Sequence, residues 1–163
     1  MPTRNLTAND LIDRAEIHDA LMTYATGIDS RDWTLYRSLF TDEIDIDFSS
    51  WSGDPVGTMK ADDWVAGVKA VISGFDGTQH LLANEVITLN GDEAVVVPYM
   101  QAHHYLNLDG EHHLQSIGGY YRHLMVRTED GWKSRSCTLT ITWEKGDRGI
   151  FEIATKRAAS QMA

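Results

Sequence analysis

The chain has 163 residues and carries 14 Lys and Arg against 24 Asp and Glu, which gives a formal net charge of −10. The length fits one domain, and so acidic a chain lacks the basic surface that holds nucleic-acid phosphates or anionic lipids. A single cysteine excludes an internal disulfide and a cysteine-based zinc site. Because no apolar signal segment or membrane-length apolar run occurs, we expect a cytoplasmic protein.

Helical patterns dominate the first part of the chain. Thr7 and Asp10 form a capping-box pattern, after which apolar residues recur at helical spacing. These residues are Leu11, Ala15, Ile17, Leu21, Met22, Ala25 and Ile28. A short second helix is expected over residues 32–40 and a third over residues 61–73, in which Trp64, Val68, Val71 and Ile72 share one side.

Strand patterns follow. Residues 44–48 alternate apolar and acidic side chains, residues 53–57 read as a turn, and the chain after residue 77 reads as antiparallel strands. Turns are expected at the Asn-Gly and Asp-Gly pairs that end at Gly91, Gly110 and Gly131. In the last strand Leu139, Ile141 and Trp143 fall on one face, opposite three threonines.

Helices followed by antiparallel strands predict the α+β class, with a curved sheet around an interior in which a small ligand would sit. One domain is expected over residues 1–163, with a core over about 7–145 and a helical or frayed tail over 146–163.

Three polar residues are candidates for chemistry, and two of them interrupt patterns that face inward. Asp29 continues the apolar stripe of the first helix near its C-terminus, where the helix dipole would raise the carboxyl pKa. His104 interrupts the more apolar face of a strand, and His80 opens another strand. The alternatives are a solvated helix-ending aspartate, a hydrogen-bonded core histidine and an ordinary strand-edge histidine.

Other chemistry finds little support in the sequence. Neighbouring histidines on a strand point to opposite faces, so each HH pair offers one ligand to a common centre, and we expect no metal site. Serine-hydrolase and nucleotide-binding motifs are absent. Tyr120 and Tyr121 point to opposite faces, so one of them is expected to line the interior.

The segments TYATGIDSRDWTLYRSLFTDEIDIDF, GTQHLLANEVITL and YYRHLMVRTEDGWKSRSCTLTITW resemble the scytalone dehydratase-like family. That family belongs to the SnoaL-like branch of the nuclear-transport-factor-2-like superfamily, and the resemblance covers roughly residues 11–143. It implies a cone-shaped, cystatin-like α+β fold, in which N-terminal helices pack on a curved antiparallel or mixed sheet. Hexachlorocyclohexane dehydrochlorinase is similar in its Asp–His pair.

The resemblance also implies roles for residues. His80 would be the base that removes a carbon-bound proton, Asp29 would orient it, and His104 or Tyr121 would donate a hydrogen bond to the leaving group or a developing oxyanion. Tyr24, Phe48 and Tyr121 would line the pocket. Ile28 and Phe48 stand where the dehydratase has tyrosines, so scytalone itself is not the expected substrate.

These residues together predict a lyase without cofactor or metal that acts on a small apolar, aromatic or polycyclic molecule. The alternatives are an isomerase or polyketide cyclase of the same fold, and a non-catalytic binding module or accessory subunit. The resemblance favours a homo-oligomer, with a trimer as the expected form.

Overall fold

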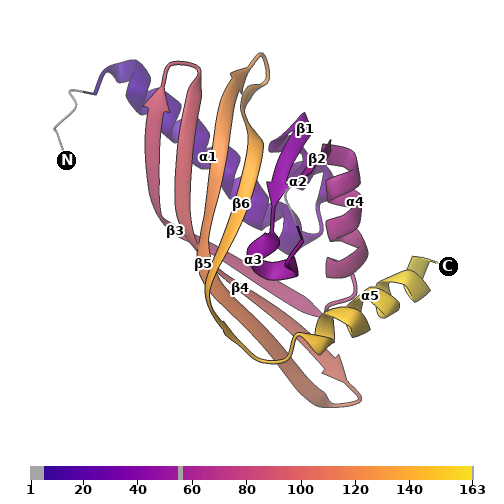
Figure 1. Ribbon diagram of the computed structural model, residues 1–163. Coiled ribbons are helices and arrows are strands. Elements are labelled where there is room, and N and C mark those ends of the chain that lie inside the picture. Colours follow the sequence, from indigo (N-terminus) through magenta and orange to yellow (C-terminus); the bar gives the residue numbers. More distant parts are fainter. Residues whose placement is uncertain (1–5, 55–56, 163) are drawn as a thin grey trace.

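Helices pack against one six-stranded sheet in the computed structural model, which describes residues 6–54 and 57–162 (Figure 1). The helices are α1 (Ala8–Ser30), α2 (Trp33–Ser38), α3 (Ser49–Ser52), α4 (Ala61–Ile72) and α5 (Gly149–Met162). The strands are β1 (Phe40–Asp47), β2 (Gly57–Lys60), β3 (Gly77–Asn90), β4 (Glu93–Leu108), β5 (Glu111–Thr128) and β6 (Gly131–Lys145). The predicted α+β class is confirmed.

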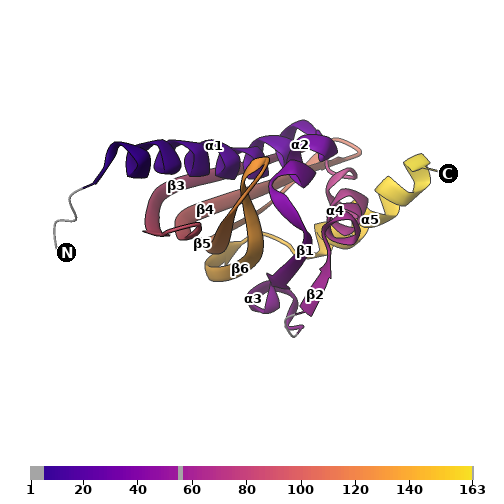
Figure 2. The same cartoon turned by 90° about the horizontal axis from the view of Figure 1, so that it is seen from above.

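The sheet is mixed, with the strand order β2-β1-β6-β5-β4-β3. Only the β1–β6 pair of these neighbours is parallel. The three long hairpins turn at the predicted dipeptides, where Gly91, Gly110 and Gly131 take positive φ angles that favour glycine. Figure 2 shows α1 running along one side of the sheet, with β1, β2, α4 and α5 gathered towards its C-terminal end. Residues of the sheet and of these helices line one cavity.

Helix α1 begins at the predicted capping box, where the Thr7 side chain accepts from the Asp10 backbone and the Asp10 side chain accepts in return. Its buried face runs through Ile17, Leu21, Tyr24 and Ile28. Leu11 is 55 % exposed, so the predicted apolar stripe is wrong at its start. The first turns of α1 extend beyond β3 (Figure 2).

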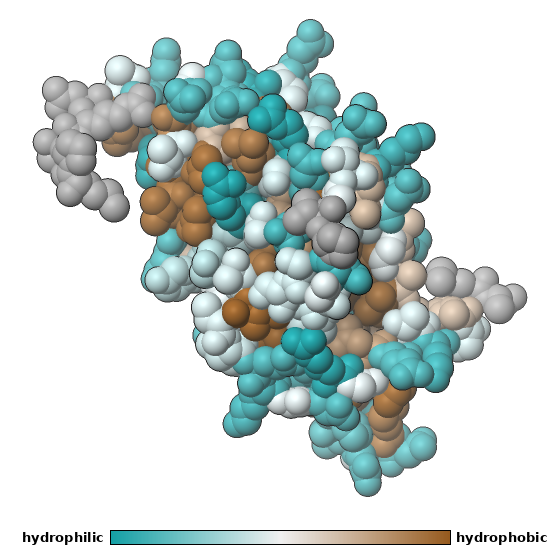
Figure 3. Space-filling view, viewed as in Figure 1, coloured by the Kyte–Doolittle hydropathy of each residue, from teal (hydrophilic) through white to brown (hydrophobic). Residues whose placement is uncertain are grey.

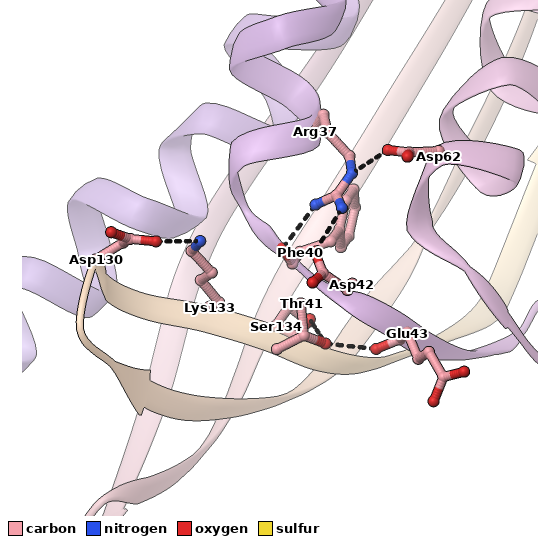
Figure 4. A network of polar contacts seen from close by, with 9 residues as sticks. All are labelled: Arg37, Phe40, Thr41, Asp42, Glu43, Asp62, Asp130, Lys133 and Ser134. Atoms are coloured by element: carbon pink, nitrogen blue, oxygen red, sulfur yellow. Dashed lines mark hydrogen bonds and ion pairs between the residues drawn. The ribbon is translucent and has the colours of Figure 1, made fainter.

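The α2–β1 connection differs from the prediction. The helix ends at Ser38, earlier than expected, and the strand already begins at Phe40. Arg37 joins the elements here: its guanidinium donates to Asp62 of α4, to Asp42 and to the Phe40 carbonyl oxygen, at 2.6, 3.0 and 3.0 Å (Figure 4). Phe48, expected in the strand, is instead the N-cap of α3. The expected turn over 53–57 includes residues 55–56, which lie outside the described residues.

Strand β6 departs from the predicted alternation near its end. Gly118 of β5 pairs with Trp143, but its neighbour Gly119 pairs with Ile141, so Thr142 is an extra residue in a bulge. The bulge reverses the facing of the residues beyond it. Trp143 is therefore 44 % exposed rather than buried with Leu139.

The segment after residue 146 is helical. It forms α5, on which Ile150, Ala154 and Ala158 are buried, so it packs onto the body of the fold. None of the helices in the described part of the chain is long and apolar enough to cross a membrane.

Apolar side chains also reach the surface of the strands (Figure 3). The exposed large hydrophobic residues of the long strands are Leu81, Val86, Tyr99, Leu114 and Trp143. The expected homo-oligomer remains a prediction.

Candidate active site

A cavity of about 620 Å³ lies between the sheet and the helices. Tyr24, Phe48, His80, His104 and Tyr121 all line it, so five of the six residues singled out from the sequence meet at one place. Most of the other lining residues are aliphatic or aromatic, and they include the predicted side of α4: Trp64, Val68, Val71 and Ile72. The interior therefore suits an apolar molecule.

Asp29, the sixth residue, is not among the described lining residues but hydrogen-bonds to His80. Its carboxylate lies 2.8 Å from Nδ1 of His80 and accepts the His80 backbone N–H at 2.7 Å. Thr78 donates a further hydrogen bond to the same carboxylate at 2.9 Å, and Arg31 donates to the Thr78 hydroxyl at 2.7 Å. The end of α1 and the start of β3 thus fix the His80 ring, whose Nδ1 faces the carboxylate.

The expected direction of the Asp29 pKa is wrong. Partial burial by itself raises this pKa, but the hydrogen bonds from His80 and Thr78 outweigh it, and the pKa lies below the usual value. These donors stabilise the charged form more than the helix C-terminus disfavours it. The Asp29 carboxyl group is therefore ionised at neutral pH, and the direction of its pKa does not favour a role as base.

His104 lies beside His80, with ring centroids 5.6 Å apart and nearly perpendicular planes. Its side chain is buried, packs against Phe75 and Phe151, and places Nδ1 3.1 Å from Oε1 of Gln115. Burial and the neighbouring His80 lower the pKa of His104 to about 3. This imidazole is neutral at ordinary pH.

Tyrosine side chains form another part of the cavity wall. The Tyr24 ring contacts those of Tyr36 and Tyr121, at centroid distances of 5.2 and 5.0 Å. Trp64 donates from Nε1 to the Tyr36 hydroxyl at 2.9 Å. Burial raises the pKa of Tyr121, so its phenol stays protonated. Tyr121, and not Tyr120, lines the cavity.

Sequence reasoning missed several contributors to the cavity, among them Tyr36 and Phe151. Tyr36 lies on a short helix with too few residues for a clear periodicity. Phe151 lies on α5, where Ile150 and Ala154 have the i, i+4 spacing of a buried face, a signal that could have marked the segment as packed.

Asp29 and His80 form a hydrogen-bonded pair, and the His80 ring contacts the His104 ring. In the described ranges 6–54 and 57–162, no three His, Cys, Asp or Glu side chains converge as a metal-ligand set. What this geometry offers chemically is an imidazole oriented by a carboxylate, at the wall of an apolar cavity.

Comparison with known proteins places these residues in a family context. Residues 9–138 match the SnoaL-like domain. The crystal structure of Kfla4162 from Kribbella flavida is 32 % identical, covers 88 % of this chain and 97 % of that chain, and gives a TM-score of 0.78.

Two more distant structures share the fold. A candidate scytalone dehydratase of Novosphingobium aromaticivorans is 19 % identical, with a TM-score of 0.76 over 88 % of this chain and 93 % of that chain. The hexachlorocyclohexane dehydrochlorinase LinA-type3 of Novosphingobium barchaimii is 20 % identical, with a TM-score of 0.66 over 85 % and 92 % of the two chains.

Proposed function

The chain belongs to the SnoaL-like family, and we propose that it is a cofactor-independent lyase that acts on a small apolar, aromatic or polycyclic substrate. Dehydratase and dehydrochlorinase names among proteins of the same fold support an elimination. The cavity lining supports the apolar substrate, because it consists mainly of aliphatic and aromatic side chains.

One observation carries the proposal. Asp29 engages Nδ1 and the backbone amide of His80, and His80 itself lines the cavity. A carboxylate on Nδ1 holds the proton there and leaves Nε2 as a lone-pair base. In the proposed reaction His80 Nε2 takes a carbon-bound proton, the C–H electron pair forms the double bond, and the leaving group departs with its own bonding pair.

Asp29 also stabilises the imidazolium that forms on His80. A protonated phenol such as Tyr121 is available to donate a hydrogen bond to the leaving group or to a developing oxyanion. In this scheme Tyr121 assists departure of the leaving group, and the Asp29–His80 pair removes the proton.

The experiment uses a model carbon acid, 5-nitrobenzisoxazole, in which loss of one C–H proton breaks the N–O bond and releases a coloured phenolate. We expect the wild-type protein to accelerate this opening and His80→Gln to lose on the order of a hundredfold or more in rate. The matched control is His103→Gln, since His103 lies on the same sheet but bonds Ser116 and does not line the cavity. A wild-type rate in His80→Gln would contradict the assignment.

An isomerase or a cyclase would use the same base. Mass analysis of the product from a natural substrate separates these reactions, because a lyase product loses the mass of the leaving group and an isomerase product does not. A binding module or accessory subunit would leave the opening of 5-nitrobenzisoxazole at its uncatalysed rate.

A further inference from the structure

A hydrogen-bonded chain runs outward from His104 to the surface. Nδ1 of His104 lies 3.1 Å from Oε1 of Gln115, and Nε2 of Gln115 donates to Oε1 of Glu144 at 3.1 Å. Arg148 donates from Nε to the same Glu144 oxygen at 2.6 Å. Each link restricts the orientation of the one before it.

The contact with Glu144 fixes the orientation of the Gln115 side-chain amide. The hydrogen bond from Arg148 lowers the pKa of Glu144, whose carboxylate is ionised and can only accept. The Gln115 atom that faces it must therefore be the NH₂ group. The amide oxygen then faces His104, and because an amide oxygen also only accepts, the proton of the imidazole sits on Nδ1.

The proton on Nδ1 determines what Nε2 of His104 can do in the cavity. A neutral imidazole with its proton on Nδ1 has a bare nitrogen at Nε2, which accepts hydrogen bonds and cannot donate one. We propose that His104 is a hydrogen-bond acceptor in the cavity, held in that state by Gln115 and Glu144, and that the substrate presents a hydroxyl or N–H donor to Nε2. This revises the sequence-based expectation that His104 donates.

The two histidines together describe the ligand. His80 and His104 both carry the proton on Nδ1 and their ring centroids lie 5.6 Å apart, so the donor would sit beside the carbon that His80 deprotonates. The described residues that line the cavity include no Lys or Arg, but they include Asp54 and Glu152. An anionic substrate finds no Lys or Arg among these lining residues, and the nearby Lys156 is already paired with Glu152 at 2.6 Å, so the ligand class is a neutral hydroxylated or N–H-bearing apolar molecule.

The inference rests on the proposed function in taking this cavity as the substrate site and His80 as the base, and its test needs no turnover. Nitrogen-15 NMR of the histidine rings in the wild-type protein reports the tautomer directly. We expect a protonated, pyrrole-type shift for Nδ1 of His104 and a bare, pyridine-type shift for Nε2.

Glu144→Gln tests the source of the tautomer. A glutamine at this position can face Gln115 with either end of its amide, so His104 should populate both tautomers. The matched control is Glu93→Gln, which also removes a glutamate that accepts from an arginine, Arg135 at 3.1 Å, but lies outside the cavity lining.

Ligand selectivity is the second readout, with indole as an apolar N–H donor and 1-methylindole as the same ring without the donor. We expect the wild type to prefer indole, and Glu144→Gln to reduce the preference by about fivefold, the size of one net hydrogen bond. Glu93→Gln should keep the wild-type ratio. A proton on Nε2 of wild-type His104 would overturn the proposal, as would an indole preference that Glu144→Gln leaves unchanged.

Discussion

Asp29 contacts His80 at two points, with one carboxylate oxygen 2.8 Å from the ring nitrogen Nδ1 and the other accepting the backbone N–H at 2.7 Å. The double contact fixes both the ring tautomer and the position of β3 against the end of α1. Because one carboxylate does both, the orientation of the base depends on helix and strand staying in register.

Asp29→Asn should lower the rate of proton removal more than it lowers stability. An asparagine keeps the shape, but its amide can present NH₂ to Nδ1 and thus favour the tautomer with the proton on Nε2. We expect the rate of 5-nitrobenzisoxazole opening to fall by about a hundredfold or more, while circular dichroism shows a folded protein. A similar substitution at the exposed Asp130, which pairs with Lys133, is the control.

Retention of the wild-type rate in Asp29→Asn would show that the carboxylate does not orient the base. Loss of rate together with loss of the folded spectrum would instead assign Asp29 a structural role at the α1–β3 junction.

Two buried histidines should make the folded protein sensitive to acid. Burial lowers the pKa of His104 to about 3 and that of His123 to about 4. Between about pH 6.5 and the lowered pKa of each histidine, the unfolded chain binds a proton at that position and the folded chain does not. The free energy of unfolding therefore falls as the pH falls, by about 1.4 kcal/mol per pH unit for each histidine.

His104→Gln tests this pH dependence. Between pH 7 and pH 5 the variant should lose about 2 kcal/mol less than the wild type in urea denaturation, because one of the two groups no longer titrates in the unfolded chain. An identical loss in both proteins would contradict the neutral, buried state of His104.

Alanine substitutions at the adjacent residues Gly118 and Gly119 of β5 should lower the free energy of unfolding to different extents. A Cβ on Gly119 would lie 1.9 Å from the Thr140 backbone oxygen, which cannot move without disturbing the bulge. The atoms nearest to a Cβ on Gly118 would all belong to the indole of Trp143, a partly exposed side chain that can rotate away. Gly119→Ala should therefore lower the free energy of unfolding by about 3 kcal/mol, and Gly118→Ala by about 1 kcal/mol or less.

Urea denaturation of the two variants gives both values. The reverse order would mean that the Trp143 indole is held more firmly on the sheet than its exposure indicates.

Sequence patterns and the resemblance together located part of the cavity wall and the Asp29 carboxylate beside it, but not the polar residues behind His104. Alternation along β4 placed His104 on the buried face, and helical spacing carried Asp29 to the end of α1. The resemblance added Tyr24 and Phe48 and gave roles to His80 and Tyr121, and these catalytic and binding roles stay predictions. Assigning side chains to the two faces of a strand by alternation works only where the strand has no bulge.

The bulge at Thr142 marks where this assignment fails. Simple alternation puts Trp143 inward and Glu144 outward, but the extra residue reverses both. Glu144 therefore reaches Gln115, which is fully buried, and the proposed control of the His104 tautomer depends on the bulge. The local sequence alternates threonines with apolar residues and contains no signal for a bulge.

Phe151 gives the last prediction, because it closes the cavity from α5. Its ring lies 4.7 Å from that of His104 and 5.0 Å from that of Phe75, so it shields the histidine from water. Phe151→Ala should remove this cover, lower the free energy of unfolding by about 2 kcal/mol and weaken indole binding severalfold. Ile153→Ala on the same helix is the matched control, since Ile153 is 40 % exposed and does not line the cavity. If both variants bind indole as the wild type does, α5 contributes stability but does not shape the site, whereas weakened binding in Phe151→Ala alone assigns α5 to the cavity wall.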